Sequence, residues 1–147
     1  MAGVAGAIAE FVGLDLLPYT DELIIENGGD IFIRSNKDRT ILIYAGEGSP
    51  FKDKIKICLR GGDRPFGVCT SSGKVGHSIS HGNTDATVII ARSAVTADVF
   101  ATAVGNIVKN EDNIEEALKF GRTCSELRCG LILIGEKMAA WGDIELV

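Results

Sequence analysis

The chain has 147 residues, of which 46% are hydrophobic and 24% charged, and its formal net charge is −5. This length is typical of one domain with a real hydrophobic core. The acidic balance, with no cluster of basic residues, argues against a nucleic-acid surface, because phosphate binding requires clustered Lys and Arg. No run of 18 apolar residues occurs, so we expect no membrane span. A small molecule or a protein is the better expectation for a partner.

The N-terminal segment predicts a helix over residues 2–17, which Pro18 ends. Its apolar residues fall at helical spacing and would form one stripe, made of Ala5, Ile8, Ala9, Val12 and Leu16. The segment is apolar enough to resemble a signal peptide, but it lacks the positive start and is interrupted by acidic residues. We therefore expect a cytoplasmic protein.

The next segments predict strands. Residues 22–26 and 31–34 would form a hairpin, since the sequence NGGD between them is a strong turn signal. Further strands are expected at residues 40–45, 55–59, 66–70 and 85–91. The last of these is apolar and β-branched, which is typical of a central strand.

The C-terminal part predicts two helices and two more strands. Ser93 is expected to cap a helix over residues 94–108. Asp112 and Glu115 resemble a capping box for a short helix that Gly121 closes. Strands would follow at residues 130–134 and 141–147. Because strands come in runs and helices are few, the fold class is α+β. We expect residues 1–147 to form one domain, as the C-terminal part of a larger architecture.

Two glycine-containing segments are candidate binding sites. In the first, Asn27, Gly28, Gly29 and Asp30, glycine lets the backbone approach a ligand and expose N–H groups to an anion. The alternative is an ordinary hairpin turn. In the second, Thr70, Ser71, Ser72 and Gly73, small hydroxyl residues could bind phosphate or ribose oxygens. The alternative is a polar loop between strands.

Three further features bear on chemistry. His77 and His81 lie in a glycine-containing segment where a helix is not expected, so a two-histidine metal site is weakly supported, although either could act as an acid–base group. Asp98 and Thr102 lie four residues apart on one helix face, among alanines, and offer oxygens suited to Mg²⁺. Tight helix packing is the alternative. The four cysteines fit neither a metal spacing nor a disulfide framework.

Taken in order, these motifs resemble the ApbE family of flavin transferases, and more closely short proteins grouped near it. The resemblance runs from residue 1 to about residue 108. It rests on VAGAIAEF, LIIENGGDI, VCTSSG, His77 and ADVFAT, each in the order that the family shows.

The resemblance implies a T-fold-like antiparallel sheet backed by helices, which binds FAD with Mg²⁺ on its pyrophosphate. Asp98, Thr102 and a main-chain carbonyl near the first helix would hold the metal. The NGGD and TSSG segments would contact the cofactor, and His77 would be the catalytic candidate. ApbE enzymes cleave FAD and attach FMN to a target flavoprotein.

Three functions follow as hypotheses. The first is binding of a flavin or nucleotide phosphate with a divalent metal. The second is Mg²⁺-dependent transfer of FMN from FAD to a flavoprotein. The third is a structural or subunit domain without a ligand, whose glycines serve only packing. We expect no nucleic-acid or membrane partner in any of these cases.

Overall fold

The computed structural model describes residues 2–75 and 81–147. Three α-helices, two short 3₁₀ helices and nine strands occur in this part of the chain. The α-helices are α1 (Val4–Leu16), α2 (Ala94–Ile107) and α3 (Ile114–Gly121), and the 3₁₀ helices are η1 (Leu17–Tyr19) and η2 (Glu111–Asn113). The strands are β1 (Leu23–Asn27), β2 (Asp30–Arg34), β3 (Arg39–Leu42), β4 (Lys56–Leu59), β5 (Phe66–Ser71), β6 (Ala86–Ala91), β7 (Leu127–Ile134), β8 (Lys137–Gly142) and β9 (Glu145–Leu146).

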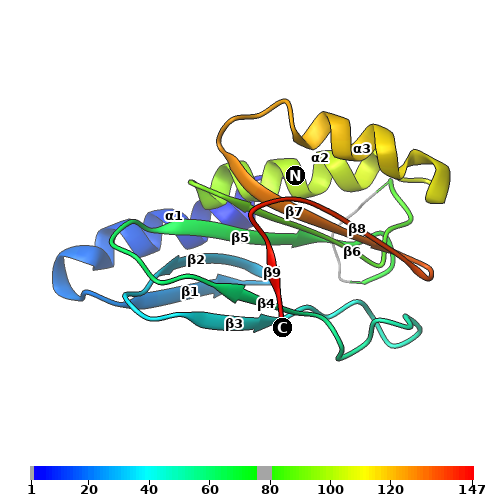
Figure 1. Ribbon diagram of the computed structural model, residues 1–147. Helices are drawn as coiled ribbons and strands as arrows, with labels where there is room; N and C mark the ends of the chain where they lie inside the picture. The colour runs from blue at the N-terminus through cyan, green and yellow to red at the C-terminus, as the bar shows by residue number, and fades with distance from the viewer. Residues whose placement is uncertain (1, 76–80) are drawn as a thin grey trace.

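The strands form two antiparallel sheets. The large sheet has six strands in the order β1-β2-β5-β6-β7-β8, and the small one has the order β3-β4-β9. Every residue of β6 is buried, as expected for a central strand. Figure 1 shows the helices along one side of the large sheet and β3, β4 and β9 on the other. The predicted α+β class, an antiparallel sheet backed by helices, is confirmed.

Two hydrophobic clusters hold these three layers together. One lies between the helices and the large sheet, and the other between the two sheets. Neighbouring residues of a strand alternate between them, because side chains point to opposite faces of a sheet. Phe32 of β2 and Cys69 of β5 face the helices, whereas Ile33 and Val68 face the small sheet. This alternation decides which site residues can meet.

The inward face of α1 differs from the predicted one. Gly6, Ala9 and Gly13 are its buried residues, so of the predicted stripe only Ala9 reaches the core fully. A Cβ at Gly13 would lie 2.1 Å from the Phe32 ring, so the helix axis runs too close to the sheet for a large side chain. The larger apolar residues Ile8, Val12 and Leu16 are exposed instead. Small residues allow this close approach, and the periodicity of apolar residues alone could not reveal it.

Several predicted boundaries need correction. Ser93 caps α2 as expected, accepting a hydrogen bond from Thr96 N. The capping box farther on is formed by Asn110 and Asn113 and starts η2, so the predicted box at Asp112 and Glu115 is wrong. The predicted last strand, residues 141–147, is in fact the end of β8 followed by the short β9, and the β7–β8 hairpin was missed. Among the described residues, no helix is long and apolar enough to cross a membrane.

Candidate ligand-binding site

The turn between β1 and β2 is the NGGD segment. Gly28 and Gly29 have φ angles of 65° and 96°, which L-residues with side chains rarely adopt. Asn27 and Asp30 pair across the turn as the last and first strand residues. Apart from their chain neighbours, no described residue has an atom within 4 Å of a Cβ built at either glycine. The glycines are thus required by the turn itself, and they leave open space in front of it.

That open space is part of a cavity of 380 Å³ between the large sheet and β3. Gly28 and Gly29 form one part of its wall, and Thr70 and Ser72 form another. The rest of the wall contains one carboxylate, Glu26, and is otherwise mostly apolar, with Ile31, Ile41, Leu42, Ile43, Tyr44, Val68 and Val75. The fold therefore brings the NGGD and TSSG segments together, although they lie about forty residues apart in the chain.

The TSSG segment has a fixed backbone. The Ser72 hydroxyl donates to Thr84 O at 3.3 Å and accepts from the backbone N–H groups of Lys74 and Val75, each at 3.0 Å. A Cβ at Gly73 would lie 2.0 Å from Gly82 O, so only glycine fits there. The Ser72 hydroxyl is used to hold the loop, whereas Thr70 and Ser71 are half-buried at the end of β5.

Asp30 lies on the other face of the sheet, towards the helices. It is 8% exposed, and its Oδ1 atom is buried without a hydrogen-bond partner among the residues that the structure describes. Burial raises the pKa of Asp30 to about 6, and the negative charge of Asp98 contributes to the rise. Hydrogen bonds from the Cys69 side chain and the Thr70 backbone oppose it. Two buried carboxylates therefore lie close enough for the charge of one to affect the other, and Asp30 Oδ1 has no hydrogen-bond donor among the described residues.

Asp98 joins α2 to the start of α1. Its Oδ2 atom accepts a hydrogen bond from Gly6 N at 3.0 Å. Asn27 reaches the same turn of α1, where its side-chain amide donates to Ala5 O at 3.3 Å. The NGGD turn, the first turn of α1 and the second turn of α2 are thus joined by side chains at one end of the large sheet.

Asp98 is not among the residues that line the 380 Å³ cavity. The resemblance assigns the NGGD and TSSG segments and Asp98 to one bound cofactor, but only the two segments line this cavity. Asp30 and its partner in β5, Cys69, point to the helix side, while Ile31 and Val68 point to the cavity side. The turn itself connects the two faces, since Gly28 and Gly29 line the cavity and Asp30 approaches Asp98.

The remaining sequence candidates are placed as follows. Thr102 is partly buried on α2, one turn after Asp98. His77 lies outside the described residues. His81 is exposed, and its backbone N–H donates to Asn106 Oδ1 at 2.8 Å. Its carbonyl accepts from the Lys109 ammonium.

A second polar recess was missed by the sequence interpretation. It has a volume of 510 Å³, is formed by the loop 44–49 with Lys74, Val75 and Asp85, and shares Tyr44 and Val75 with the first cavity. The buried Asp85 carboxylate accepts from Lys74 Nζ at 2.6 Å and from Ser49 Oγ at 3.0 Å. A lysine directly after TSSG and an aspartate at the start of a buried strand were the signals that could have revealed it.

The four cysteines are free thiols. Cys69 is the one nearest the site, and its Sγ lies 3.3 Å from Ala94 O, an acceptor that competes with Asp30 for the single thiol proton. Burial raises the pKa of Cys69 far above its usual range, with the charge of Asp30 adding to the effect. Burial also raises the pKa of Cys129 to about 11. Since the thiolate is the reactive form, neither buried thiol is a nucleophile at neutral pH.

Comparison with known proteins identifies the family. The family model described as "AbpE bacteria" matches residues 1–125. The chain belongs to this family. Among curated relatives, a UPF0280 protein of Methanothrix thermoacetophila is 40% identical over 146 residues, and one of Methanococcus aeolicus is 38% identical over 149 residues. Each alignment covers 98% of this chain and 60% of the relative. The chain thus spans about three fifths of the length of these relatives.

Solved structures show the same fold. The apo flavinyl transferase ApbE of Pseudomonas stutzeri superposes with a TM-score of 0.63 at 16% identity, covering 94% of this chain and 48% of that one. The ApbE protein of Thermotoga maritima gives 0.63 at 21% identity, covering 97% and 49%. The similarity to ApbE proteins expected from the motifs is therefore confirmed for the fold.

Proposed function

We propose that this domain binds a flavin or another nucleotide phosphate together with a divalent cation. The observation that carries the proposal is a pair of buried carboxylates, Asp98 at the first turn of α1 and Asp30 close enough for the charge of Asp98 to raise its pKa, with no partner for Asp30 Oδ1 among the described residues. A packing role alone gives no reason to bury a second carboxylate beside the first, because each buried charge costs free energy unless it is paired.

The donors at this end of the sheet fit a hard cation. Asp98 and Thr102 would supply a carboxylate and a hydroxyl oxygen, and Mg²⁺ prefers oxygen ligands. The main-chain carbonyl near the first helix would be that of Ala5, which lies beside Gly6 and is already approached by Asn27. A bound cation would also relieve the repulsion between Asp98 and Asp30. Its chemistry would be to neutralise the charge of a pyrophosphate and to make it a better electrophile.

The cavity side would hold the organic part of the ligand. The 380 Å³ cavity is lined mainly by aliphatic residues and Tyr44, as is usual for sites of small aromatic molecules. Gly28 and Gly29 lie between this cavity and the carboxylates of Asp30 and Asp98. Because they have no side chains, a ligand could extend past them from the cavity to the carboxylates. Their backbone N–H groups would face a phosphate there.

The test is isothermal titration with FAD, in Mg²⁺ and in EDTA, of the wild type and Asp98→Asn. Asparagine keeps an acceptor for Gly6 N but removes the charge, so it separates the cation site from the helix contact. We expect Mg²⁺ to tighten FAD binding at least 10-fold in the wild type and to have no effect in Asp98→Asn. The matched control is Asp63→Asn, an exposed carboxylate, which should behave as the wild type.

The outcomes separate the three hypotheses. FAD binding that does not respond to Mg²⁺ in the wild type would contradict the cation site. No binding of FAD, ADP or FMN under either condition would leave a structural domain, and Asp98 would be a packing residue. Transferase activity is the alternative that the solved structures suggest, since one of them is a flavinyl transferase. Release of AMP from FAD, measured by chromatography in the presence of Mg²⁺, would favour it over binding alone.

A further inference from the structure

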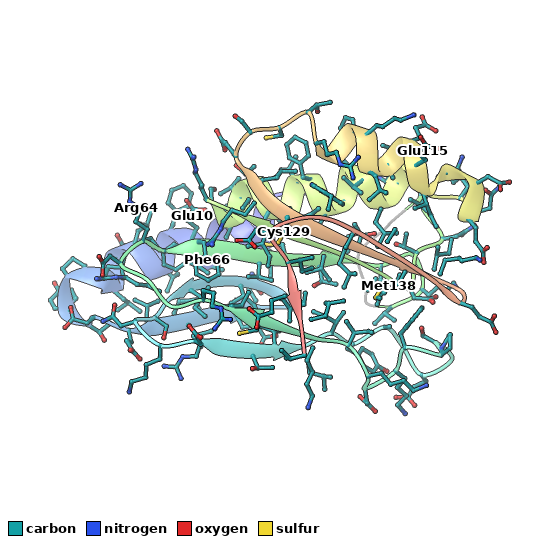
Figure 2. The ribbon with its side chains drawn as sticks, viewed as in Figure 1. Glu10, Arg64, Phe66, Glu115, Cys129 and Met138 are labelled. Carbon is teal, nitrogen blue, oxygen red and sulfur yellow. The ribbon has the colours of Figure 1, made fainter. Side chains whose placement is uncertain are left out.

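A third recess, of 460 Å³, lies at the start of β5, whereas the TSSG segment follows at the other end of that strand. Three arginines and two apolar residues line it, namely Arg64, Arg92, Arg128, Pro65 and Phe66. They belong to the start of β5, the residue after β6 and the start of β7, which are neighbouring strands. Figure 2 shows Arg64 and Phe66 in this part of the molecule, far from Met138 on the β7–β8 hairpin. Because the arginines are far apart in the sequence, only the folded chain reveals them as a cluster.

A β-bulge directs one of these arginines. The pairing of β7 with β6 skips Arg128, because the register shifts between Ile90 and Ala91. A bulge changes the direction of the side chain on the extra residue, and bulges are frequent beside functional sites. The Arg128 guanidinium lies over the Phe66 ring, with Cζ 5.1 Å from the ring centroid. Since Phe66 is only 6% exposed, a ring fixed by the core holds this cation in the recess.

The three guanidiniums have no counter-ion among the described residues. None of them forms an ion pair or a hydrogen bond with that part of the chain. Among the acidic residues of the surrounding segments, Glu10 accepts from the capping serine of α2 and Glu126 accepts from Thr96. Neither Asp63 nor Asp143 lines the recess. In a chain of net charge −5, three cations are therefore gathered where they repel one another, and an anion would relieve that repulsion.

We propose that this recess binds a phosphate group. A guanidinium presents its N–H donors in a planar fork that matches phosphate oxygens, and such charge-assisted hydrogen bonds are stronger than neutral ones. Pro65 and Phe66 add an apolar wall on which the organic part of a phosphorylated small molecule can rest. The volume is within the range of small-molecule sites. The recess shares no lining residue with the two cavities described above, so this proposal is independent of the proposed function.

The test is a titration of the ¹⁵N-labelled protein with inorganic phosphate in EDTA at pH 6.5, followed through the arginine Nε–H signals. Phosphate should shift the signals of Arg64, Arg92 and Arg128 until they saturate. Arg92→Gln and Arg128→Gln should each weaken phosphate binding at least about 10-fold, because each removes a cation and its hydrogen bonds. The control is Lys137→Gln, which removes the same charge from an exposed residue beside Met138, and it should change the affinity by less than about 2-fold.

Phenyl phosphate, titrated in the same way, distinguishes the two sources of the phosphate group. Tighter binding than that of inorganic phosphate supports a site for an organic phosphate, and equal affinity supports a site for the free ion.

Three results would overturn the proposal. The first is a phosphate titration that saturates none of the three arginine signals. The second is an equal loss of affinity in Lys137→Gln and Arg92→Gln, which would show only a general attraction between charges. The third is a glutamate-rich peptide that binds more tightly than either phosphate and loses its affinity in Arg92→Gln and Arg128→Gln. That result would assign the recess to an acidic segment of a partner protein.

Discussion

The backbone N–H of Gly6 donates a hydrogen bond of 3.0 Å to Oδ2 of Asp98, so the first turn of α1 is fixed directly to the second turn of α2. The contact depends on the absence of a side chain. A Cβ at Gly6 would lie 2.4 Å from Ala94 O and 2.8 Å from Asp98 Cβ. The first four N–H groups of a helix have no partner within it, and Asp98 supplies one.

Gly6→Ala should therefore separate the two helices. We expect a loss of about 1–3 kcal/mol of unfolding free energy from overpacking, although alanine is the better helix former by about 1 kcal/mol. Urea denaturation measures it. Gly62→Ala is the control, because a Cβ there would meet no atom within 4 Å in the described part of the chain, its two neighbours apart. Equal stability of the two variants would show that α1 can shift without cost.

Asp98→Ala and Asp98→Asn should differ in the free protein. Alanine leaves the buried Gly6 N–H without an acceptor, which costs about 1–3 kcal/mol. Asparagine keeps the acceptor and removes the repulsion with Asp30, so we expect its stability to equal or exceed that of the wild type at pH 7. Thermal unfolding in EDTA compares the three proteins. A lower Tm for the asparagine variant than for the alanine variant would contradict this account of the hydrogen bond.

The pH dependence of stability should report on Asp30. Its pKa is raised from 3.8 to about 6, so the folded state keeps the proton over a range where the unfolded chain has lost it. Stability should therefore fall as pH rises from about 4 to about 6, by about 2–3 kcal/mol in total, and change no further through this group above that range. Asp30→Asn should abolish this decline and be more stable than the wild type at pH 7. Denaturant titrations between pH 4 and 8 measure it, and the exposed Asp63→Asn should keep the wild-type slope.

The sequence predicted the secondary structure correctly where the local sequence pattern and the packing in the fold favour the same element. The NGGD turn needs positive φ angles, which glycine supplies, and the β-branched run before Ser93 is the buried β6. The sequence could not show which face of α1 is buried, because its large apolar residues form the exposed face. The buried face has Gly6 and Gly13, whose close contacts with α2 and Phe32 are visible only in the folded chain. The strand β8 also has little pattern of its own, and only its pairing with β7 defines it.

The sequence indicated which segments belong to the candidate site, but it could not show how their side chains are arranged in space. Gly28 and Gly29 of the NGGD segment and Thr70 and Ser72 of the TSSG segment line one cavity. Which side of the sheet each residue faces depends on register, and a shift by one residue reverses it. Asp30 and Gly29 are adjacent in the chain, yet one approaches Asp98 and the other lines the cavity. The pairing of Lys74 with Asp85 crosses a loop and needed the folded chain to be seen.

Replacing Lys74 in the second recess should lower the unfolding free energy of the protein. The Asp85 side chain is 3% exposed and that of Lys74 is 53% exposed, so Lys74→Met would leave a buried carboxylate with Ser49 as its remaining side-chain donor among the described residues. We expect a loss of about 1–3 kcal/mol at pH 7, below the 3–5 kcal/mol typical of a fully buried pair because water still reaches the lysine. Lys119→Met is the matched control, because it pairs with Glu115, which is labelled on α3 in Figure 2, and both side chains are largely exposed, so water screens the pair and its contribution should be small. Urea denaturation of both variants gives the comparison, and a Lys74→Met loss no larger than that of Lys119→Met would mean that solvent or another donor satisfies Asp85.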